Sequence, residues 1–377
     1  MKRQAIKSAA LAVSANAEFF VTLCAYALLV LVASRKWDIP ISLALYDQTF
    51  ALFGAAVTVA LLVYLIAKTV LIDKPNRPFE HLWRSKFCLD WKMPERLTIG
   101  LPVALVMPIF FSLFTSVKAS INTIVPFYAD PFFASADRIV SGNSDAWLIL
   151  QPFIGFPVVT FALNFVYNLW FIIMITTLFC VTFLVGDLRL RSQYLVAFVL
   201  VWAILGNAMA VVFSSVGPCF YEFFYGLPRY ADLMEYLHTA NRDFPIWSLI
   251  AQNYLLNAND APHIGAGISA FPSLHVAVAM LNVMLCRHLR RLWQIASILF
   301  LILILIGSVQ LGWHYAVDGY FSIIVVPAIW WVAGKVSLVN VFKRVVPDPS
   351  LHGSARYGGP LKPNRLPELQ QSIKPNV

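Results

Sequence analysis

Two short polar stretches, set at the two ends of a hydrophobic hairpin, contain side chains suited to acid–base or nucleophilic chemistry. One is Phe271-Pro272-Ser273-Leu274-His275 and the other is His314-Tyr315-Ala316-Val317-Asp318. In a continuous helix His314 and Asp318 share a face, so the carboxylate can hold one ring nitrogen while the other faces a substrate. That is the arrangement of an oriented nucleophile or base. A purely structural His–Asp bond is the alternative.

Ser273 is predicted to cap the N-terminus of the helix that carries His275. Pro272 fixes the approach of the chain, and free backbone amides with the positive end of the helix dipole make this end a seat for an anion such as phosphate. His275, in the first turn, is then a candidate general acid. The alternative is a capping serine followed by a histidine that merely lies at the level of lipid headgroups.

The hairpin that positions these residues belongs to a strongly apolar chain. Its 377 residues are 59% hydrophobic and only 12% charged, and the mean hydropathy is +0.72. Soluble domains have roughly one half apolar and one quarter charged residues. We therefore expect an all-α, polytopic membrane helical bundle. The net charge of +9 does not indicate nucleic-acid binding, because the basic residues fall between apolar spans and form no stripe.

Eight apolar segments are long enough to cross a bilayer as helices. They are Ala15–Ser34, Thr49–Ile72, Leu97–Val117, Ala162–Val185, Tyr194–Val216, Ser273–Leu292, Trp293–Gly312 and Gly319–Val339. The last six are expected to form a core domain over residues 97–339. Residues 1–96 contribute two further spans and a cytoplasmic amphipathic loop, and residues 340–377 form a Pro-rich basic tail expected to be disordered and cytoplasmic.

Lysine and arginine predict the orientation, because cytoplasmic loops are enriched in them. With the N-terminus inside, the cytoplasmic face receives Lys74, Arg77, Arg84, Lys86, Lys92, Arg96, Arg189, Arg191, Arg287, Arg290, Arg291, Lys343 and Arg344. The opposite face keeps Arg35, Lys36, Lys118, Arg138, Arg229 and Arg242. Both termini are then cytoplasmic, and His275 and His314 face the non-cytoplasmic side at similar depth. We expect a multi-pass protein of a bacterial inner membrane.

Two shorter segments are expected on the same outer side as the histidines. Asp130–Val140 reads as an amphipathic segment that could cover the site or steer lipid towards it. Trp147–Val159 is apolar but is interrupted by Pro152 and Pro157, so it is interpreted as a half-buried interfacial helix and not as a further span.

At its two polar stretches the chain resembles the type-2 phosphatidic acid phosphatase superfamily, and more closely the inositol phosphorylceramide synthase branch. Phe271-Pro272-Ser273-Leu274-His275 is similar to the second motif of that branch, and His314-Tyr315-Ala316-Val317-Asp318 to the third. The resemblance covers the six spans from Leu97 to Val339. It implies that His314 attacks a lipid phosphorus and carries a phosphohistidine, that Asp318 orients the imidazole, and that His275 protonates the departing oxygen.

The chain departs from the phosphatase pattern at its basic residues. Phosphatases of the superfamily carry Ser-Arg seven and six residues before the third-motif histidine, where this chain has Gly307 and Ser308. The first phosphatase motif, a lysine followed by six residues and Arg-Pro, is also absent, since Arg77-Pro78 lies on the predicted cytoplasmic side with Val70 at the lysine position. The usual cationic clamp is therefore incomplete.

The candidates for binding the substrate phosphate are Ser273, Arg229 and Arg242, with Arg229 preferred among the arginines and an interfacial role as its alternative. A phosphodiester brings one negative charge and a monoester nearly two, so the small number of cations in the site favours a diester donor. The expected function is transfer of a phosphoryl headgroup from a phospholipid to a lipid alcohol such as ceramide or diacylglycerol. A lipid phosphate phosphatase and a transporter with a His/Asp relay are the alternatives. The candidate residues require neither a metal nor a cofactor.

Overall fold

Helices account for all the regular structure in the part of the chain that the structure describes. A computed structural model describes residues 2–83, 92–257 and 262–336. The helices are α1 (Lys2–Trp37), α2 (Asp47–Ala67), η1 (Lys68–Asp73), α3 (Pro78–Glu80), α4 (Met93–Ala119), α5 (Ile121–Ile124), α6 (Asp130–Val140), α7 (Ala146–Ile154), α8 (Pro157–Phe183), α9 (Leu188–Val201), η3 (Trp202–Met209), α10 (Ala210–Val212), η4 (Pro218–Phe220), α11 (Tyr221–Tyr225), α12 (Ala231–Asp243), α13 (Trp247–Asn257), α14 (Leu274–Cys286), α15 (Arg291–Gln310) and α16 (Ala316–Val336).

Seven of the eight expected spans are long and apolar enough to cross a membrane. They are Ala12–Trp37, Asp47–Asp73, Met93–Ala119, Pro157–Phe183, Leu188–Val212, Arg291–Gln310 and Ala316–Val336. The chain is thus an all-α, multi-pass membrane protein. The remaining segment, predicted as a span over Ser273–Leu292, is shorter than predicted. Its helix α14 has only 13 residues, which is about 20 Å at 1.5 Å per residue.

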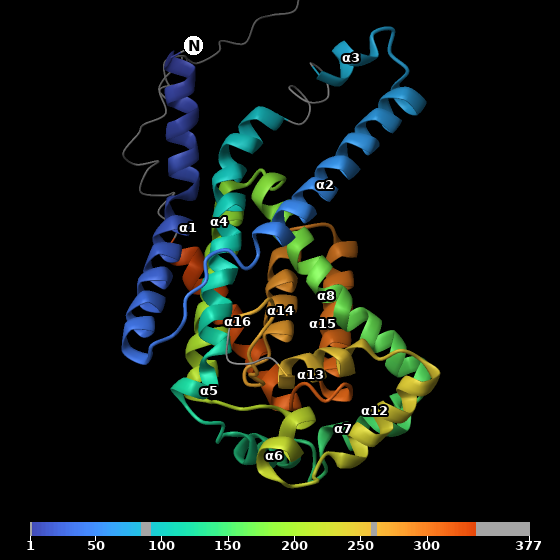
Figure 1. The fold of residues 1–377 in the computed structure, drawn as a ribbon. Helices are drawn as coiled ribbons and strands as arrows, with labels where there is room; N and C mark the ends of the chain where they lie inside the picture. Colours follow the sequence, from blue (N-terminus) through green and yellow to red (C-terminus); the bar gives the residue numbers. More distant parts are fainter. Residues whose placement is uncertain (1, 84–91, 258–261, 337–377) are drawn as a thin grey trace, which may run out of the picture. The chain divides into compact units, whose positions relative to one another are not determined.

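The shortness of α14 follows from its place in the fold. It contacts α8, α9, α15 and α16, and Figure 1 shows it in the middle of the bundle. Val276, Ala277, Val278, Ala279 and Leu281 are completely buried. A helix surrounded by protein has its side chains covered by neighbouring helices, so it does not have to match the thickness of the bilayer as a lipid-facing span does. The sequence pattern could not distinguish this buried core helix from a span.

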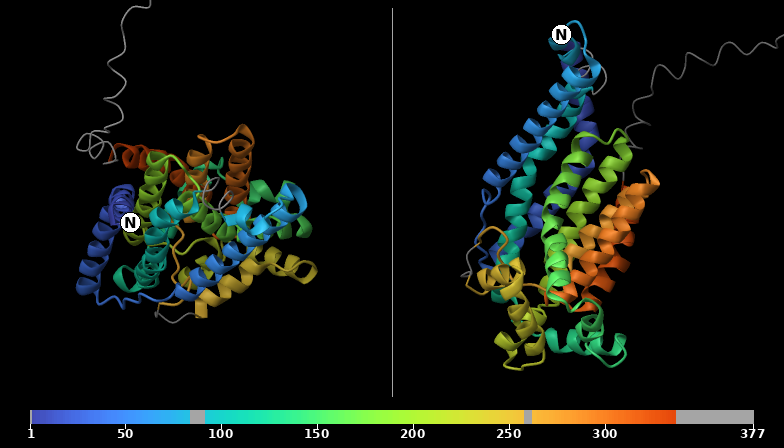
Figure 2. Two further views of the ribbon diagram at one scale, coloured as in Figure 1. Left: turned by 90° about the horizontal axis from the view of Figure 1, so that it is seen from above. Right: turned by 90° about the vertical axis from the view of Figure 1, so that its right-hand side faces the viewer.

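Short helices gather at one end of the bundle. Figures 1 and 2 show α6, α7 and α12 there, at the end where α15 gives way to α16. The predicted outer segment at residues 130–140 is the helix α6, with the same bounds. The segment predicted from Trp147 is divided, because α7 stops at Ile154 and Pro157 begins the long helix α8.

The first two helices pack unevenly against the rest. Helix α1 contacts α4 and α9, and buried Arg191 of α9 donates to the Asn16 side chain of α1 at 2.9 Å and to the Thr182 carbonyl at 3.0 Å. Helix α2 buries only Phe50 and Leu65. Residues 1–338 form one compact unit. The predicted boundaries at residues 96 and 339 stay a prediction, and the tail at 340–377 and residues 84–91 of the amphipathic loop lie outside the described residues.

Candidate active site

His314 lies in the turn that joins α15 to α16, and the helix expected to continue through it ends at Gln310. Gly312, with φ of +73°, provides the left-handed residue that lets the chain reverse. The Ser308 carbonyl accepts hydrogen bonds from the Trp313 amide at 3.0 Å and the His314 amide at 3.1 Å. These backbone hydrogen bonds fix the turn and therefore the position of the His314 Cα. The His314 side chain is 7% exposed.

Asp318 approaches His314 from the first turn of α16. Its Oδ2 lies 3.4 Å from Nδ1 of His314, and its side chain is completely buried. The same oxygen accepts the Tyr315 amide at 3.1 Å, which fixes the carboxylate. Among the described residues, neither Nδ1 of His314 nor Oδ1 of Asp318 has a well-aligned hydrogen-bond partner. The carboxylate is thus positioned to hold Nδ1, which leaves Nε2 of His314 as the atom that can meet a substrate.

Asp137 of α6 supports the same helix start, and sequence reasoning missed it. One of its carboxylate oxygens accepts the Ala316 amide at 2.7 Å and the Val317 amide at 3.3 Å, and the other accepts the Ala146 amide at 3.2 Å. Burial raises the pKa of Asp137, while these backbone amides oppose that rise. The sequence shows only that an acidic residue lies in a predicted outer segment. It does not show the contact with α16, because no local pattern links positions 137 and 316.

Ser273 is the N-cap of α14, as predicted. Its Oγ accepts the Val276 amide at 3.4 Å, and the hydroxyl is completely buried. Ser322 of α16 donates to the Ser273 carbonyl and to the Asp318 carbonyl, both at 3.0 Å, so the starts of α14 and α16 are tied together. Ser273 is not among the residues that line the cavity described below, and its contact with phosphate stays a prediction.

His275 is held between two aromatic rings of α8. Its ring lies 4.5 Å from Tyr167 at 14° and 4.2 Å from Trp170 at 34°, measured between centroids. The Trp170 indole also donates to the His275 carbonyl at 2.9 Å. Neither aromatic residue was singled out from the sequence, because aromatic residues are frequent throughout the apolar spans. Their packing fixes the orientation of the imidazole.

The two histidines meet at one end of the bundle. Their ring centroids are 6.4 Å apart at 57°, which confirms that both stretches lie on the same side at similar depth. A cavity of about 500 Å³ has both rings in its wall. Its lining is mostly aromatic and aliphatic, and includes Tyr46, Thr49, Phe50, Phe111, Phe114, Thr115, Lys118, Tyr167, Trp170, Phe171, Met174, Ile175, Trp202, Trp313 and the loop at 264–269. An apolar chamber next to an oriented histidine fits a substrate with both a lipid chain and a reactive polar group.

The two arginines predicted to bind phosphate, Arg229 and Arg242, lie outside the lining of this cavity. Arg229 pairs with Asp145 at 2.6 Å and donates to the Ala134 carbonyl at 2.7 Å. The hydrogen bond that Arg229 donates to the Asp145 carboxylate is the main reason that the pKa of Arg229 is raised. Arg242 is exposed on the last turn of α12. Neither lines the cavity that contains the histidines, so their contact with phosphate stays a prediction without geometric support.

A sequence model of the PAP2 superfamily matches residues 132–332, more than half of the chain. The chain belongs to the PAP2 superfamily. Comparisons with curated proteins and with solved structures found no match. The matched region runs from within α6 to within α16 and therefore contains both histidines and Asp318. Helices α1, α2 and α4 precede it, although the expected resemblance began at Leu97. Because the superfamily comprises phosphatases and phosphotransferases, the chain is an enzyme of that class.

The positions that depart from the phosphatase pattern have structural roles here. Ser308 is completely buried, and its carbonyl holds the turn that carries His314. A side chain at Gly307 would bring its Cβ to 3.3 Å from the Tyr167 ring, so this position is crowded by the residue that stacks on His275. Among the described residues, no three His, Cys, Asp or Glu side chains lie close enough together to hold a metal ion.

Proposed function

We propose that this enzyme is a lipid phosphotransferase that moves a phosphoryl headgroup from a phospholipid to a lipid alcohol through a phosphohistidine on His314. The observation that carries the proposal is the placing of His314, 3.4 Å from Asp318 and 6.4 Å from the His275 ring, in the wall of an apolar cavity. The motifs at residues 271–275 and 314–318 support the inositol phosphorylceramide synthase-like branch as the specific class.

The first step transfers the phosphoryl headgroup to the enzyme. Nε2 of His314 attacks the phosphorus of the donor, and the bond from phosphorus to the diacylglycerol oxygen breaks. That oxygen takes a proton from His275, so diacylglycerol leaves as a neutral alcohol. Asp318 stabilises the charge on the His314 ring through Nδ1.

The second step regenerates both histidines. The acceptor hydroxyl gives its proton to His275 while its oxygen attacks the phosphorus, and the bond from phosphorus to Nε2 breaks. The product is a new phosphodiester lipid, and His275 is protonated again for the next donor. Both histidines line one cavity, whose mainly apolar lining suits the chains of the donor or the acceptor.

The charge of the cavity favours a diester over a monoester. Lys118 is the one lysine or arginine among the described residues in its lining, and Arg229 is already paired with Asp145. A phosphatidic acid headgroup carries nearly two negative charges and calls for several fixed cations, whereas a phosphodiester carries one. Release of inorganic phosphate from a lipid monoester is accordingly the second candidate, supported by the breadth of the superfamily.

Purified protein incubated with labelled phospholipids tests the proposal. Phosphatidylinositol, phosphatidylethanolamine, phosphatidylglycerol and phosphatidic acid are each supplied with and without ceramide or diacylglycerol. We expect a new phosphodiester lipid that depends on the acceptor. Faster release of inorganic phosphate from phosphatidic acid than any headgroup transfer would contradict the transferase assignment and leave the phosphatase.

A further inference from the structure

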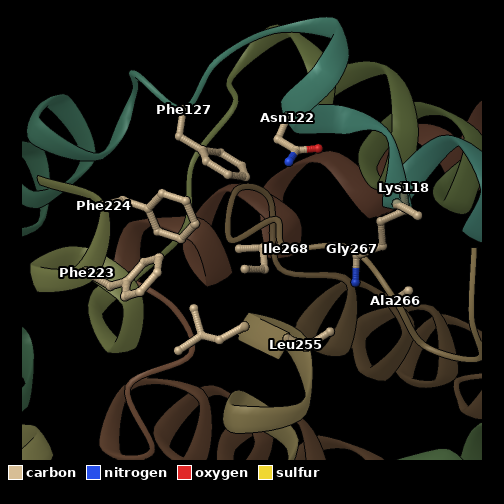
Figure 3. A pocket seen from close by; sticks show the side chains of 11 residues that line it. Lys118, Asn122, Phe127, Phe223, Phe224, Leu255, Ala266, Gly267 and Ile268 are labelled. Carbon is tan, nitrogen blue, oxygen red and sulfur yellow. The ribbon is translucent and has the colours of Figure 1, made fainter. Parts of the chain in front are cut away.

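The stretch at 262–272 that leads into α14 contains the boundary between two cavities. Its residues 266–268 line both the cavity of about 500 Å³ that contains the two histidines and a smaller cavity of about 150 Å³. Figure 3 shows these residues beside the smaller cavity, opposite Phe223 and Phe224. Both phenylalanine side chains are exposed, so the smaller cavity lies at the surface of the described residues. Residues 266–268, here called the partition, therefore stand between the histidines and that surface.

The partition lies directly against the end of α4. Gly267 has φ of +94°, and a Cβ at that position would lie 2.4 Å from the Lys118 carbonyl oxygen and 2.8 Å from the Ala119 amide nitrogen. Glycine alone combines such a backbone conformation with such a close approach. Backbone packs on backbone here, so the partition meets α4 without a gap at this point.

A tyrosine from the N-terminal part of the chain holds the backbone next to the partition. Tyr46 stands directly before α2, and its hydroxyl accepts the Gly265 amide at 3.0 Å. The same hydroxyl shares a hydrogen bond of 2.9 Å with the buried Thr115 hydroxyl of α4. The Tyr46 ring packs 5.8 Å from Phe111 and lines the large cavity. Because a phenol can accept one hydrogen bond and donate another, Tyr46 links the loop to α4 through its hydroxyl.

Other contacts hold the chain before and after the partition. The Tyr254 hydroxyl of α13 donates to the Ile264 carbonyl at 3.2 Å, and the Ser215 carbonyl accepts the Ala270 amide at 3.0 Å. All of these residues lie within the region that matches the PAP2 superfamily. Tyr46 lies outside that region, so the superfamily match of the chain does not account for its contact with the loop.

We propose that Tyr46 holds the partition closed and thereby favours a lipid alcohol over water as acceptor of the phosphoryl group on His314. The inference rests on the proposed function. With the partition displaced, a water molecule from the side of the smaller cavity gives a proton to His275 while its oxygen attacks the phosphorus, and the bond from phosphorus to Nε2 of His314 breaks. The headgroup then leaves as a phosphate monoester. Exclusion of water protects a reactive intermediate from this hydrolysis, and Tyr46 acts through the loop as a positioning residue.

The ratio of two products tests the role of Tyr46. Enzyme in lipid nanodiscs is supplied with phosphatidylinositol labelled in the headgroup and with ceramide, and the water-soluble label is compared with the label in new phosphodiester lipid. Tyr46→Phe removes the hydroxyl and keeps the ring against Phe111. We expect this ratio to rise about fivefold, because a neutral hydrogen bond contributes about that factor. Partial unfolding of the variant lowers both products together and leaves the ratio unchanged.

Two further variants show whether the effect belongs to the partition. Thr115→Val removes the group that Tyr46 contacts on α4 but leaves the bond to Gly265, so we expect a smaller rise of about twofold. Tyr128→Phe is the matched control, because the Tyr128 hydroxyl donates to the Val212 carbonyl at 2.5 Å and Tyr128 lines neither cavity. Its ratio should equal that of the parent, and a rise as large as in Tyr46→Phe overturns the inference.

Access of water to the large cavity is measured separately from turnover. Met174 is buried and lines that cavity, and Met174→Cys places a thiol there for a charged, water-soluble thiosulfonate reagent. Peptide mass spectrometry follows its labelling, with the native cysteines as internal references. We expect Tyr46→Phe to speed labelling at position 174 by about the same fivefold, and Tyr128→Phe to leave the labelling rate unchanged.

The outcomes distinguish this inference from the proposed function. Headgroup transfer by the parent with an unchanged product ratio in Tyr46→Phe keeps the transferase and overturns the inference. A higher ratio without faster labelling also overturns it, because water then reaches the phosphorus by another route. Faster labelling in Tyr46→Phe, together with a parent that transfers no headgroup, refutes the transferase and keeps the partition as a barrier to water. If the parent transfers no headgroup and labelling is unchanged, both fail.

Discussion

The cavity has two walls of different origin. One wall is built by α8, α14 and the turn before α16, which contribute Tyr167, Trp170, His275 and His314 and lie within the PAP2 match. The other is built by the start of α2 and by α4, which contribute Phe50, Phe111, Phe114 and Lys118 and precede it. The first wall, here called the histidine wall, contains the groups that can make and break bonds. The second, the N-terminal wall, offers mainly apolar surface and one charge.

This difference suggests that the two walls have different functions. The histidine wall is fixed by backbone hydrogen bonds to Ser308 and Asp137 and by rings stacked on His275, as chemistry with little tolerance for misplacement requires. Helix α2 buries only two residues, so its part of the N-terminal wall is held less tightly, whereas α4 is extensively buried. Reaction type should follow from the first wall, and choice of lipid from the second.

The largest effect is expected from His314→Ala on the histidine wall. Loss of the attacking nitrogen should reduce headgroup transfer by at least about 10⁴-fold and abolish any ³²P-labelled covalent intermediate, while lipid binding and thermal unfolding stay unchanged. His288→Ala is the matched control, because His288 is exposed beyond the opposite end of α14. Full activity of His314→Ala would remove the phosphohistidine mechanism and the division between the walls.

Asp318→Asn should give the next largest effect. The amide oxygen can still accept the Tyr315 amide, but the negative charge that stabilises the His314 imidazolium is lost. We expect kcat to fall by about 10²- to 10⁴-fold with a much smaller change in KM and in the unfolding temperature. A loss of stability that matches the loss of activity would instead assign Asp318 to the folding of α16.

Phe50→Ala on the N-terminal wall should give the smallest effect. Phe50 packs 5.5 Å from Phe111 and lines the cavity. Removing its ring should raise KM for a long-chain lipid by about three- to tenfold, as expected for losing part of one aromatic contact, and leave kcat nearly constant. Phe53→Ala is the matched control, since Phe53 packs 5.4 Å from Phe179 and does not line the cavity. A large fall in kcat for Phe50→Ala would show that the walls are not separate in function.

The histidine wall could be predicted from the sequence in its main parts. Hydropathy predicted the spans, the residues around Ser273 predicted a helix start, and the spacing of the spans brought His275 and His314 to the same side. These features depend on local composition and on helix length, which a sequence states directly. Hydropathy does not give the role of α14, because a buried core helix and a lipid-facing span have the same apolar pattern.

The contacts between distant segments could not be predicted. Asp137 reaches the amides of α16 across 179 residues, and Lys118 comes to the cavity through the packing of the loop at Gly267. Arg229 lies in the predicted outer loop, but the sequence does not show that its guanidinium pairs with Asp145. A local pattern states which side chains are available, and only the fold determines which of them face one another.

Helices α14 and α15 leave the same arginine-rich end of the bundle but differ in length. The 13 residues of α14 span about 20 Å, whereas the 20 residues of α15 span about 30 Å, which is the thickness of the hydrocarbon core of a bilayer. The end with exposed Arg287, Arg290 and Arg291 is expected at the aqueous boundary, because guanidinium groups are costly in hydrocarbon. The turn that follows α15 and carries His314 is then expected near the opposite boundary, and the His275 ring lies 6.4 Å from the His314 ring. With this geometry we expect a lipid phosphate to meet the two histidines at the level of the neighbouring headgroups, while its chains stay in the bilayer.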